Sequence, residues 1–409
     1  ILEPVIKQAR EGIIVSYDLN KAIESIPQLL KDNESKRIYF SNGKPIAVGT
    51  RMIRDDLANT FEIIAKNGVD GFYKGEIQQK FLKAMKRNNG FLQESDFENY
   101  KVNSGPPIMV RYRENLVVTA GPPSGGGVVL LTSLNILNNF NLKKYKSNST
   151  PTYHLIAEAL RRGHNNRSHY IGDPSFFNVP IDKLLSQKRT KEFLKDINSK
   201  KATPSSKIKP LKVLNESRDT THYSIIDKHG NAVSNTYTLG YSFGSGVTIP
   251  GTGILMNNQM NNFAYRYGDK SVNGRVGSPG NRYEPGKRPM STMAPSMVFN
   301  KENELMLVTG SPGGSYIPAA ILRVISGVID FDLNIGSATM LPRIHKDWPY
   351  KGLDYETTMS SDVVKKLDAI GHNPEPNKTM GSTQSIHIID GVRYGYADLR
   401  RPNAAVSIQ

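Results

Sequence analysis

The spacing of apolar residues in the first half of the chain predicts helices. In four segments, apolar side chains recur every three or four positions and leave a polar face, which is the period of an amphipathic helix. The predicted helices span Asp18–Leu30, Arg51–Asn67, Gly75–Lys86 and Pro151–Arg162.

A short hairpin and a turn interrupt this helical series. Met109–Arg113 and Asn115–Ala120 are two short runs rich in strand-forming residues, and together they predict a hairpin. Pro122–Gly127 reads as a Pro/Gly-rich turn. It leads into an apolar helix predicted over Val128–Asn138.

The second half of the chain begins after a change of character. Asp196–Asp219 is rich in Lys, Ser, Asn and Pro and has little periodicity, so we expect an exposed linker. Beyond it, Thr221–Asp227 and Ala232–Leu239 alternate apolar and polar residues around the turn Lys228–Asn231, as paired strands do. Further strands are predicted at Met297–Phe299, Leu305–Thr309, Ser385–Ile389 and Arg393–Ala397, and further helices at Ile317–Ile329 and Ser361–Ile370.

Strands and helices on both sides of the linker predict an α/β protein of stacked layers. The composition, 38% hydrophobic and 22% charged, is that of an ordinary folded protein. With 409 residues, one large layered domain and two closely packed lobes both remain open. No run of about 18 uncharged apolar residues occurs, so we predict no transmembrane segment.

Cysteine is absent, which excludes disulfides, thiolate metal sites and a cysteine nucleophile. The chain opens at Ile1 without a basic-then-apolar signal segment, so a leader has been removed or the chain starts further upstream. A chain without cysteine suits an exported bacterial protein. We therefore expect an extracellular, cell-surface or cell-wall location.

The charge balance is strongly basic, with 53 Lys and Arg against 37 Asp and Glu and a formal net charge of +16. Such a surface attracts polyanions, although a basic surface that only aids solubility remains an equal alternative. No helix-turn-helix, zinc-finger or aromatic RNA-binding signature accompanies the charge. Nucleic acid is therefore not an expected partner, and other acidic polymers stay open.

Several common catalytic motifs are missing. The histidines are scattered, without HExxH or His/Cys ligand spacing, so we predict neither a metal site nor a cofactor. No GxSxG elbow is present. Two glycine clusters, Gly125–Gly127 and Gly310–Ser315, precede helices. Their backbone amides suit an anion site or an oxyanion hole, and a tight loop is the structural alternative.

The segment around Thr220 carries the most specific chemical signal. There the polar linker ends and a strand begins. Cleavage before Thr220 would place a hydroxyl and a free α-amine on one residue. An α-amine has a reference pKa of about 7.7–8.0, so it can accept the hydroxyl proton near neutral pH. The structural alternative is an ordinary Ser/Thr-rich strand start.

These residues resemble the γ-glutamyltranspeptidase family. The likeness covers the strand pair from Thr220 and four later blocks: Gly253–Met260, Lys287–Met293, Thr309–Ser315 and Met380–Ser385. Upstream, Asp70–Gly75 and Pro122–Gly127 resemble blocks of the family's large subunit. The implied fold is the four-layer αββα sandwich of N-terminal-nucleophile hydrolases. The resemblance also implies a family large subunit that begins upstream of Ile1, with an arginine there that binds the substrate α-carboxylate.

The resemblance implies self-cleavage between Asp219 and Thr220. Residues 1–219 would then be the large-subunit fragment, and residues 220–409 the small catalytic fragment. The two fragments are expected to stay associated as one composite domain. Thr220 would be the nucleophile, and the Thr238 hydroxyl would hold its side chain. The backbone amides of Gly313 and Gly314 would form the oxyanion hole.

The resemblance also assigns substrate contacts. Ser291 and Thr292 would bind the substrate α-carboxylate, and Gln259 would face its α-nitrogen. Ala264–Gly286 resembles the lid loop over the pocket. The donor would be a γ-glutamyl compound, and the acceptor water or an amine.

Two positions depart from family members that use glutathione. This chain has Gly240 where they usually have Asn, and Asn262 where they have Asp. Both positions would contact the substrate α-ammonium. A donor whose α-nitrogen is a neutral amide, such as poly-γ-glutamate, fits these replacements and the basic composition. The sequence therefore favours the capsule-depolymerase branch, with transfer to water or a cell-wall amine. A glutathione enzyme is the first alternative, and a truncated, non-catalytic polyanion-binding relative is the second.

Overall fold

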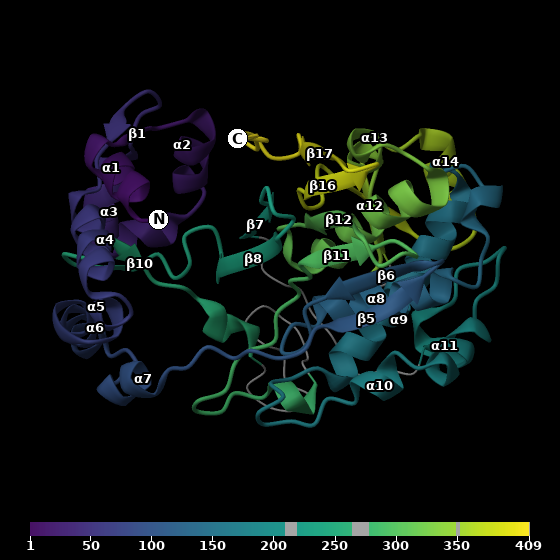
Figure 1. Ribbon diagram of the computed structural model, residues 1–409, viewed down its shortest axis with the longest axis horizontal. Helices are drawn as coiled ribbons and strands as arrows, with labels where there is room; N and C mark the ends of the chain where they lie inside the picture. Colours follow the sequence, from purple (N-terminus) through teal and green to yellow (C-terminus); the bar gives the residue numbers. More distant parts are fainter. Residues whose placement is uncertain (209–218, 264–277, 349–351, 409) are drawn as a thin grey trace. The chain divides into compact units, whose positions relative to one another are not determined.

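The computed structural model describes residues 1–208, 219–263, 278–348 and 352–408. The chain forms two compact units (Figure 1). Unit 1 comprises Ile1–Gly105 and Leu239–Asn258, and unit 2 comprises Pro106–Thr238 and Gln259–Gln409. Each unit has a core of its own. Two small apolar clusters, around Ile23 and Phe81, lie in unit 1, and one large cluster lies in unit 2.

Unit 1 is mainly helical, as the period of its apolar residues predicts. One predicted helix, Asp18–Leu30, is wrong because it breaks in two. Pro27 lacks an amide hydrogen and disfavours a helical residue before it, and Ile26 accordingly has φ −120° and ψ 78°. The helices are α1 Glu3–Glu11, α2 Tyr17–Glu24, the 3₁₀ turn Pro27–Lys31, α3 Asn33–Tyr39, α4 Asp55–Asn67, α5 Asp70–Tyr73, α6 Gly75–Asn88 and α7 Glu94–Asn99.

Two-residue strands complete unit 1. They pair as β1 with β4, β2 with β3, and β9 with β10. The predicted helix Arg51–Asn67 therefore starts late, because its first two residues form β4. The strand bounds are β1 Ile13–Ile14, β2 Phe40–Ser41, β3 Lys44–Pro45, β4 Arg51–Met52, β9 Thr248–Ile249 and β10 Ile254–Leu255.

Unit 2 is built on a six-stranded antiparallel sheet with the strand order β17-β16-β12-β11-β6-β5 (Figure 1). Every strand that the sequence predicts for this sheet is present. The bounds are β5 Ile108–Tyr112, β6 Asn115–Thr119, β11 Ser296–Phe299, β12 Leu305–Gly310, β16 Gln384–Ile389 and β17 Val392–Ala397.

Helices and a strand pair cover opposite faces of this sheet. Leu307 of β12 belongs to the large core with α8 Gly126–Leu137 and α12 Ile317–Phe331. Gly310, three residues further along β12, faces the opposite side of the sheet. A Cβ there would meet His222 of the separate strand pair β7 Asp219–Ile226 and β8 Ala232–Gly240. Within unit 2 the layers are thus helix, sheet and strand pair. The other α-helices and strands described in unit 2 are α9 Thr150–Tyr170, α10 Ile181–Leu184, α11 Gln187–Leu194, α13 Ile335–Met340, α14 Ser361–Ala369, β13 Ile344–His345, β14 Leu353–Glu356 and β15 Pro374–Asn377.

Unit 2 contains one long apolar helix. Gly314–Phe331, which joins a 3₁₀ turn to α12, is the one helix among the described residues that is long and apolar enough to cross a membrane. In the fold, 83% of this segment is buried. It packs in the large apolar core of unit 2.

Helix α9 runs eight residues beyond its predicted end at Arg162. The prediction stopped at Gly163, but this glycine lies inside the helix. A Cβ there would sit 2.6 Å from the carbonyl oxygen of Val129 on α8. Gly163 therefore allows α8 and α9 to approach closely rather than ending the helix.

The beginning of the predicted linker Asp196–Asp219 is packed rather than exposed. Ala202, Thr203 and Ile208 are buried. The Thr203 hydroxyl donates to Glu158 on α9 at 2.6 Å, and the Trp348 indole donates to the carbonyl of Ile208 at 3.1 Å. Residues 209–218 of the predicted linker lie outside the described residues.

Candidate active site

The β7–β8 hairpin places Thr220 against the six-stranded sheet. Residues along a strand point alternately to its two faces. Tyr223 and Ile225 of β7 are exposed, whereas Thr220 and His222 are 9% and 5% exposed. Ser224 belongs to the same inward set, because its hydroxyl donates to the carbonyl of Gln384 on β16 at 2.9 Å. The predicted nucleophile therefore faces the interior of unit 2.

The turn of the hairpin sets which residue lies opposite Thr220. The amide of Asp227 donates to the carbonyl of Asn231 at 3.0 Å, and five positions back His222 contacts Thr236, with Nδ1 and Oγ1 2.8 Å apart. In antiparallel strands each step back on one strand is a step forward on the other. The position opposite Thr220 is therefore Thr238, as the predicted contact between their side chains requires.

Three contacts locate Thr220 at one end of the sheet. Ser224 bonds the carbonyl of Gln384, and a Cβ on Gly310 would lie 2.1 Å from the His222 ring, so β7 crosses the last residue of β12 and the first residue of β16. Thr220 lies two residues further on. There Arg401, four residues past the end of β17, donates from Nη1 to the Thr220 carbonyl at 2.8 Å. Thr220 therefore lies where the loops after β12 and β17 begin.

His222 is not a general base for this site. The Ser224 hydroxyl uses its hydrogen on Gln384, so its oxygen accepts from His222 Nε2 at 3.1 Å. Nδ1 is then the acceptor for the Thr236 hydroxyl. Burial lowers the pKa of His222 to about 4, so the ring is neutral near pH 7. Both ring nitrogens are occupied by structural hydrogen bonds, which leaves the α-amine predicted for Thr220 as the base.

The predicted oxyanion glycines lie in the loop between β12 and α12. Gly313 has φ 130° and Gly314 has φ 56°, conformations that favour glycine. A Cβ on Gly313 would also lie 2.9 Å from the Cα of Gly381. Tyr316 fixes the loop: its amide donates to the Gly313 carbonyl at 3.0 Å, and its hydroxyl donates to Asp354 at 2.9 Å. Amides at the start of a helix suit developing negative charge.

A row of side-chain amides connects the nucleophile hairpin to the predicted substrate residues. Gln259 Nε2 donates to the Thr238 carbonyl at 3.2 Å, and Asn262 Nδ2 donates to Gln259 Oε1 at 2.6 Å. Asn281, which is buried, donates to the Asn262 carbonyl at 2.7 Å and accepts from the amide of Met290 at 2.9 Å. The structure thus brings Gln259 and Asn262 together with the segment that precedes Ser291.

Ser291 and Thr292 are joined to the Pro122–Gly127 turn and to α9. The amide of Gly125 donates to the Ser291 carbonyl at 2.8 Å. The Ser291 hydroxyl donates to the Ser124 hydroxyl at 2.9 Å, and Arg167 Nη2 donates to Thr292 Oγ1 at 3.2 Å. The predicted carboxylate-binding pair therefore has a serine on one side and a buried guanidinium on the other.

Gly240 belongs to unit 1, where its surroundings explain the missing side chain. It has φ 98°, and a Cβ there would lie 1.9 Å from Asn258 Oδ1. That oxygen accepts from the amide of Tyr241 at 2.9 Å. The Asn258 amide thus fills the space that a side chain at position 240 would need.

Four residues of this region escaped the sequence analysis as individual residues. They come from a turn, a helix, a loop and the segment after the last strand, and nothing in their local sequence marks them. Only three-dimensional contact reveals them: Ser124, Arg167, Asn281 and Arg401. The predicted lid, Ala264–Gly286, lies outside the described residues up to position 277.

A buried group on α9 resembles a metal site in composition but not in its bonding. Ligand atoms of His154, Glu158 and His372 lie within 4.8 Å of one another. The two imidazoles bond each other, with Nδ1 of His154 2.7 Å from Nε2 of His372. Glu158 forms ion pairs with Arg161 and Arg162. Although burial opposes it, these two arginines lower the pKa of Glu158 to about 2. Two adjacent guanidiniums disfavour a cation, so we interpret the group as a polar core.

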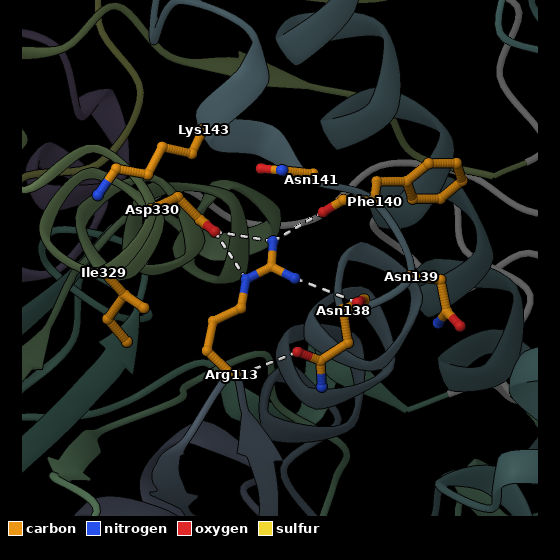
Figure 2. A pocket seen from close by; sticks show the side chains of 8 residues that line it. All are labelled: Arg113, Asn138, Asn139, Phe140, Asn141, Lys143, Ile329 and Asp330. Carbon is orange, nitrogen blue, oxygen red and sulfur yellow. Dashed lines mark hydrogen bonds and ion pairs between the residues drawn. The ribbon is translucent and has the colours of Figure 1, made fainter.

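A polar cavity of about 380 Å³ contains none of the predicted site residues. At its centre Arg113 donates from Nε to Asp330 Oδ1 at 2.8 Å, and from its two Nη atoms to the carbonyls of Asn138 and Phe140 (Figure 2). Tyr112 donates to the other oxygen of Asp330. Burial raises the pKa of Asp330. Since protein acceptors surround the guanidinium, we interpret this network as fastening the β5–β6 hairpin to α12 and to the segment that follows α8.

Comparison with known proteins agrees with the resemblance. The family model "Gamma-glutamyltranspeptidase" matches residues 1–408. The chain is 40% identical over 404 residues to a glutathione hydrolase proenzyme of Escherichia coli strain K12, covering 98% of this chain and 70% of that protein. It is 32% identical over 426 residues to a glutathione hydrolase proenzyme of Bacillus subtilis strain 168, covering 100% of this chain and 70% of that protein.

A solved structure supports the fold. The chain is similar to a cephalosporin acylase from Bacillus halodurans, with a TM-score of 0.85 and 27% identity, covering 100% of this chain and 74% of that one. The predicted fold class, an α/β N-terminal-nucleophile hydrolase, is confirmed by this match together with the layers of unit 2. The roles of the individual site residues stay predictions.

Proposed function

The chain belongs to the γ-glutamyltranspeptidase family, and from this membership we propose that it is a self-cleaving γ-glutamyl transferase and hydrolase with Thr220 as nucleophile. The observation that carries the proposal is the position of Thr220. This residue is buried, lies at the start of β7, and is opposite Thr238 at the end of the sheet. Relatives named as proenzymes support a maturation step in which the chain is cleaved.

Maturation needs no group beyond the chain and water. The Thr220 hydroxyl oxygen attacks the Asp219 carbonyl carbon, the bond from that carbon to the Thr220 nitrogen breaks, and the nitrogen takes up the hydroxyl proton. Water then hydrolyses the resulting ester. This leaves Asp219 with a C-terminal main-chain carboxylate and returns the hydroxyl to Thr220, whose α-amine is now free. Residues 1–219 and 220–409 become two fragments, which we propose remain associated because unit 2 contains parts of both.

In turnover, the freed α-amine accepts the hydroxyl proton while Thr220 Oγ1 attacks the γ-carbonyl carbon of the donor. Negative charge develops on the carbonyl oxygen, and the amides of Gly313 and Gly314 stabilise it. When this tetrahedral intermediate collapses, the donor amine leaves with the proton that the α-amine had accepted. A γ-glutamyl ester then remains on Thr220. Water or an amine acceptor then resolves this ester. The loss of one such amide donor typically costs about 10²–10³ in rate.

The donor is proposed to be poly-γ-glutamate, with a cell-wall amine or water as acceptor. Asn262 and Gly240 offer no carboxylate to an α-ammonium, whereas an internal residue of the polymer has a neutral α-amide. The net charge of +16 suits a polyanion. Glutathione is an equally supported candidate, because relatives at 32–40% identity are named glutathione hydrolases. A polymeric cell-surface substrate would place the enzyme outside the cell or on the bacterial cell wall.

The test of this proposal is the fate of the Asp219–Thr220 bond. Purified wild type should give two bands, and mass spectrometry should find a new N-terminus at Thr220. Thr220→Ala should remain a single chain, because no hydroxyl is left to attack. Thr221→Ala is the matched control, since Thr221 is exposed on the opposite face of β7, and it should cleave normally. A wild type that stays whole would favour the non-catalytic polyanion-binding alternative.

A further inference from the structure

A buried arginine lies directly behind the predicted carboxylate-binding pair. Arg167, in the last turn of α9, is 3% exposed. A Cβ on Gly125 would lie 2.8 Å from Arg167 Cγ, and a Cβ on Gly126 would lie 2.0 Å from the carbonyl oxygen of Thr292. The two glycines therefore let the turn before α8, the Ser291–Thr292 segment and the arginine stem pack closely together.

The hydrogen-bond directions distinguish Thr292 from Ser291. A guanidinium can only donate, so Thr292 Oγ1 is the acceptor of Arg167 Nη2, and its own hydrogen points away from the arginine. Ser291 is placed differently. Its hydroxyl donates to Ser124 at 2.9 Å, and Ser124 in turn donates to the carbonyl of Met293. The hydrogen of Ser291 is therefore directed into the protein.

We propose that Arg167 is a positioning residue that aims the Thr292 hydroxyl at the α-carboxylate of the donor. Arginine retains its charge in proteins, and a hydrogen bond from a charged donor holds the Thr292 oxygen more strongly than one from a neutral donor would. Thr292 then makes the main hydroxyl contact with the carboxylate, and Ser291 supports the turn through Ser124. This role rests on the proposed function. It holds for both candidate donors, because glutathione and poly-γ-glutamate both carry a free α-carboxylate on the γ-linked residue.

The experiment compares two small donors that differ at one group. The first is γ-glutamyl-p-nitroanilide, which has the α-carboxylate. The second is the same anilide with the α-carboxylate replaced by a carboxamide. Steady-state kcat and KM are measured for self-processed wild type, Arg167→Met, Arg167→Lys, Thr292→Val and the double variant Arg167→Met/Thr292→Val. Arg189→Met is the control, because Arg189 also bonds α9, through Asn166 at 3.2 Å, and its ion pair is with Glu192.

For the carboxylate donor, we expect Arg167→Met and Thr292→Val each to raise KM by roughly 10- to 100-fold, the range for a hydrogen bond that involves a charged group. The carboxamide donor should change by less than about threefold, and Arg167→Lys should recover part of the loss. Because Arg167 acts through Thr292, the double variant should be no worse than the poorer single variant. If Arg167→Met does not mature, Thr292→Val keeps Arg167 in place and tests the same discrimination.

Each remaining outcome counts against one proposal. Equal KM increases for both donors, or losses that multiply in the double variant, mean that Arg167 only supports packing. A loss of kcat alone has the same meaning. If wild type cleaves neither donor, the proposed function fails, and the role of Arg167 fails with it. Unchanged kinetics in Arg189→Met are required before any change at Arg167 is assigned to the carboxylate.

Discussion

The guanidinium of Arg401 donates a hydrogen bond of 2.8 Å to the backbone carbonyl of Thr220. Arg401 follows a turn that is firmly held, because buried Asp398 accepts from the Thr383 amide at 2.9 Å and from Arg343 at 2.6 Å. The segment after β17 therefore fixes the backbone of the proposed nucleophile from outside its own hairpin.

We predict that Arg401→Met slows both maturation and turnover by roughly 10- to 100-fold, because a hydrogen bond from a charged donor to the Thr220 backbone is lost. Arg401→Lys should be less affected. The measurements are the rate of chain cleavage after purification and kcat on a γ-glutamyl anilide. Arg111→Met is the control, since the guanidinium of this exposed arginine donates to the Glu114 carbonyl in its own hairpin. If both rates match wild type, the contact does not position Thr220.

The Thr238 position gives a second prediction. The hairpin turn places Thr238 opposite Thr220. Thr238→Val keeps the side-chain shape and removes the hydroxyl, so we expect a loss of roughly 3- to 10-fold in both cleavage and turnover, the range for a neutral hydrogen bond. Thr221→Val, on the exposed face, should change neither rate. An unaffected Thr238→Val would limit Thr238 to packing.

Local patterns predicted most of the elements of unit 2. Alternation along β7 and β8 predicted the hairpin, whereas the role of Thr238 beside Thr220 came from the family resemblance. The same local rules failed where contacts between residues distant in sequence determine the structure of a segment. The predicted helix ends before Gly163, yet this glycine lies inside α9, where α8 packs against it. Thr203 reads as linker, yet it bonds Glu158, 45 residues earlier.

The site was predictable only in part, for a similar physical reason. The glycines at 313 and 314 and the threonine at the strand start are signalled by backbone and chemical needs that are local. Asn281 and Arg401 are ordinary polar residues in irregular segments. Their roles come from partners that are close in space but distant in sequence, which no period or spacing reveals.

Acid should destabilise the fold through its buried histidines. Burial, and then the neighbouring His154 and Lys346, lower the pKa of His372 from 6.5 to about 3. The unfolded chain therefore binds a proton below pH 6.5 that the folded chain does not accept until about pH 3. The contribution of His372 to the free energy of unfolding is therefore present in full above pH 6.5. It falls as the pH drops from 6.5 to about 3, by up to about 1.4 kcal/mol per pH unit.

Urea unfolding midpoints at pH 7.5, 5.5 and 4.5 measure this effect. His372→Gln should be less stable at pH 7.5, because its bond to His154 is altered, but its stability should fall less steeply with acid. His229→Gln, at an exposed position in the β7–β8 turn, should keep the slope of wild type. Equal slopes in all three proteins would contradict the assignment of acid sensitivity to His372.

The choice between polymer and glutathione depends on charge at the substrate α-nitrogen. Asn262→Asp would introduce a carboxylate that attracts an α-ammonium, and a buried cation is costly without such a partner. The structure adds a cost. Asn262 Nδ2 now donates to Gln259 Oε1, so an aspartate would require the Gln259 amide to turn and bring its oxygen toward the Thr238 carbonyl. Gly240→Asn is more strained, because of φ 98° and the Asn258 side chain, and we expect it to lower stability.

The decisive measurement is a competition between poly-γ-glutamate and glutathione on one enzyme preparation at low and high salt. Wild type should prefer the polymer, and salt should reduce that preference because screening weakens the attraction of a basic surface for a polyanion. Asn262→Asp should shift the preference toward glutathione, whereas Asn88→Asp, which adds the same charge at an exposed position on α6, should leave it unchanged. If glutathione wins at both salt concentrations, or if the polymer's advantage is independent of salt, the enzyme is a glutathione hydrolase.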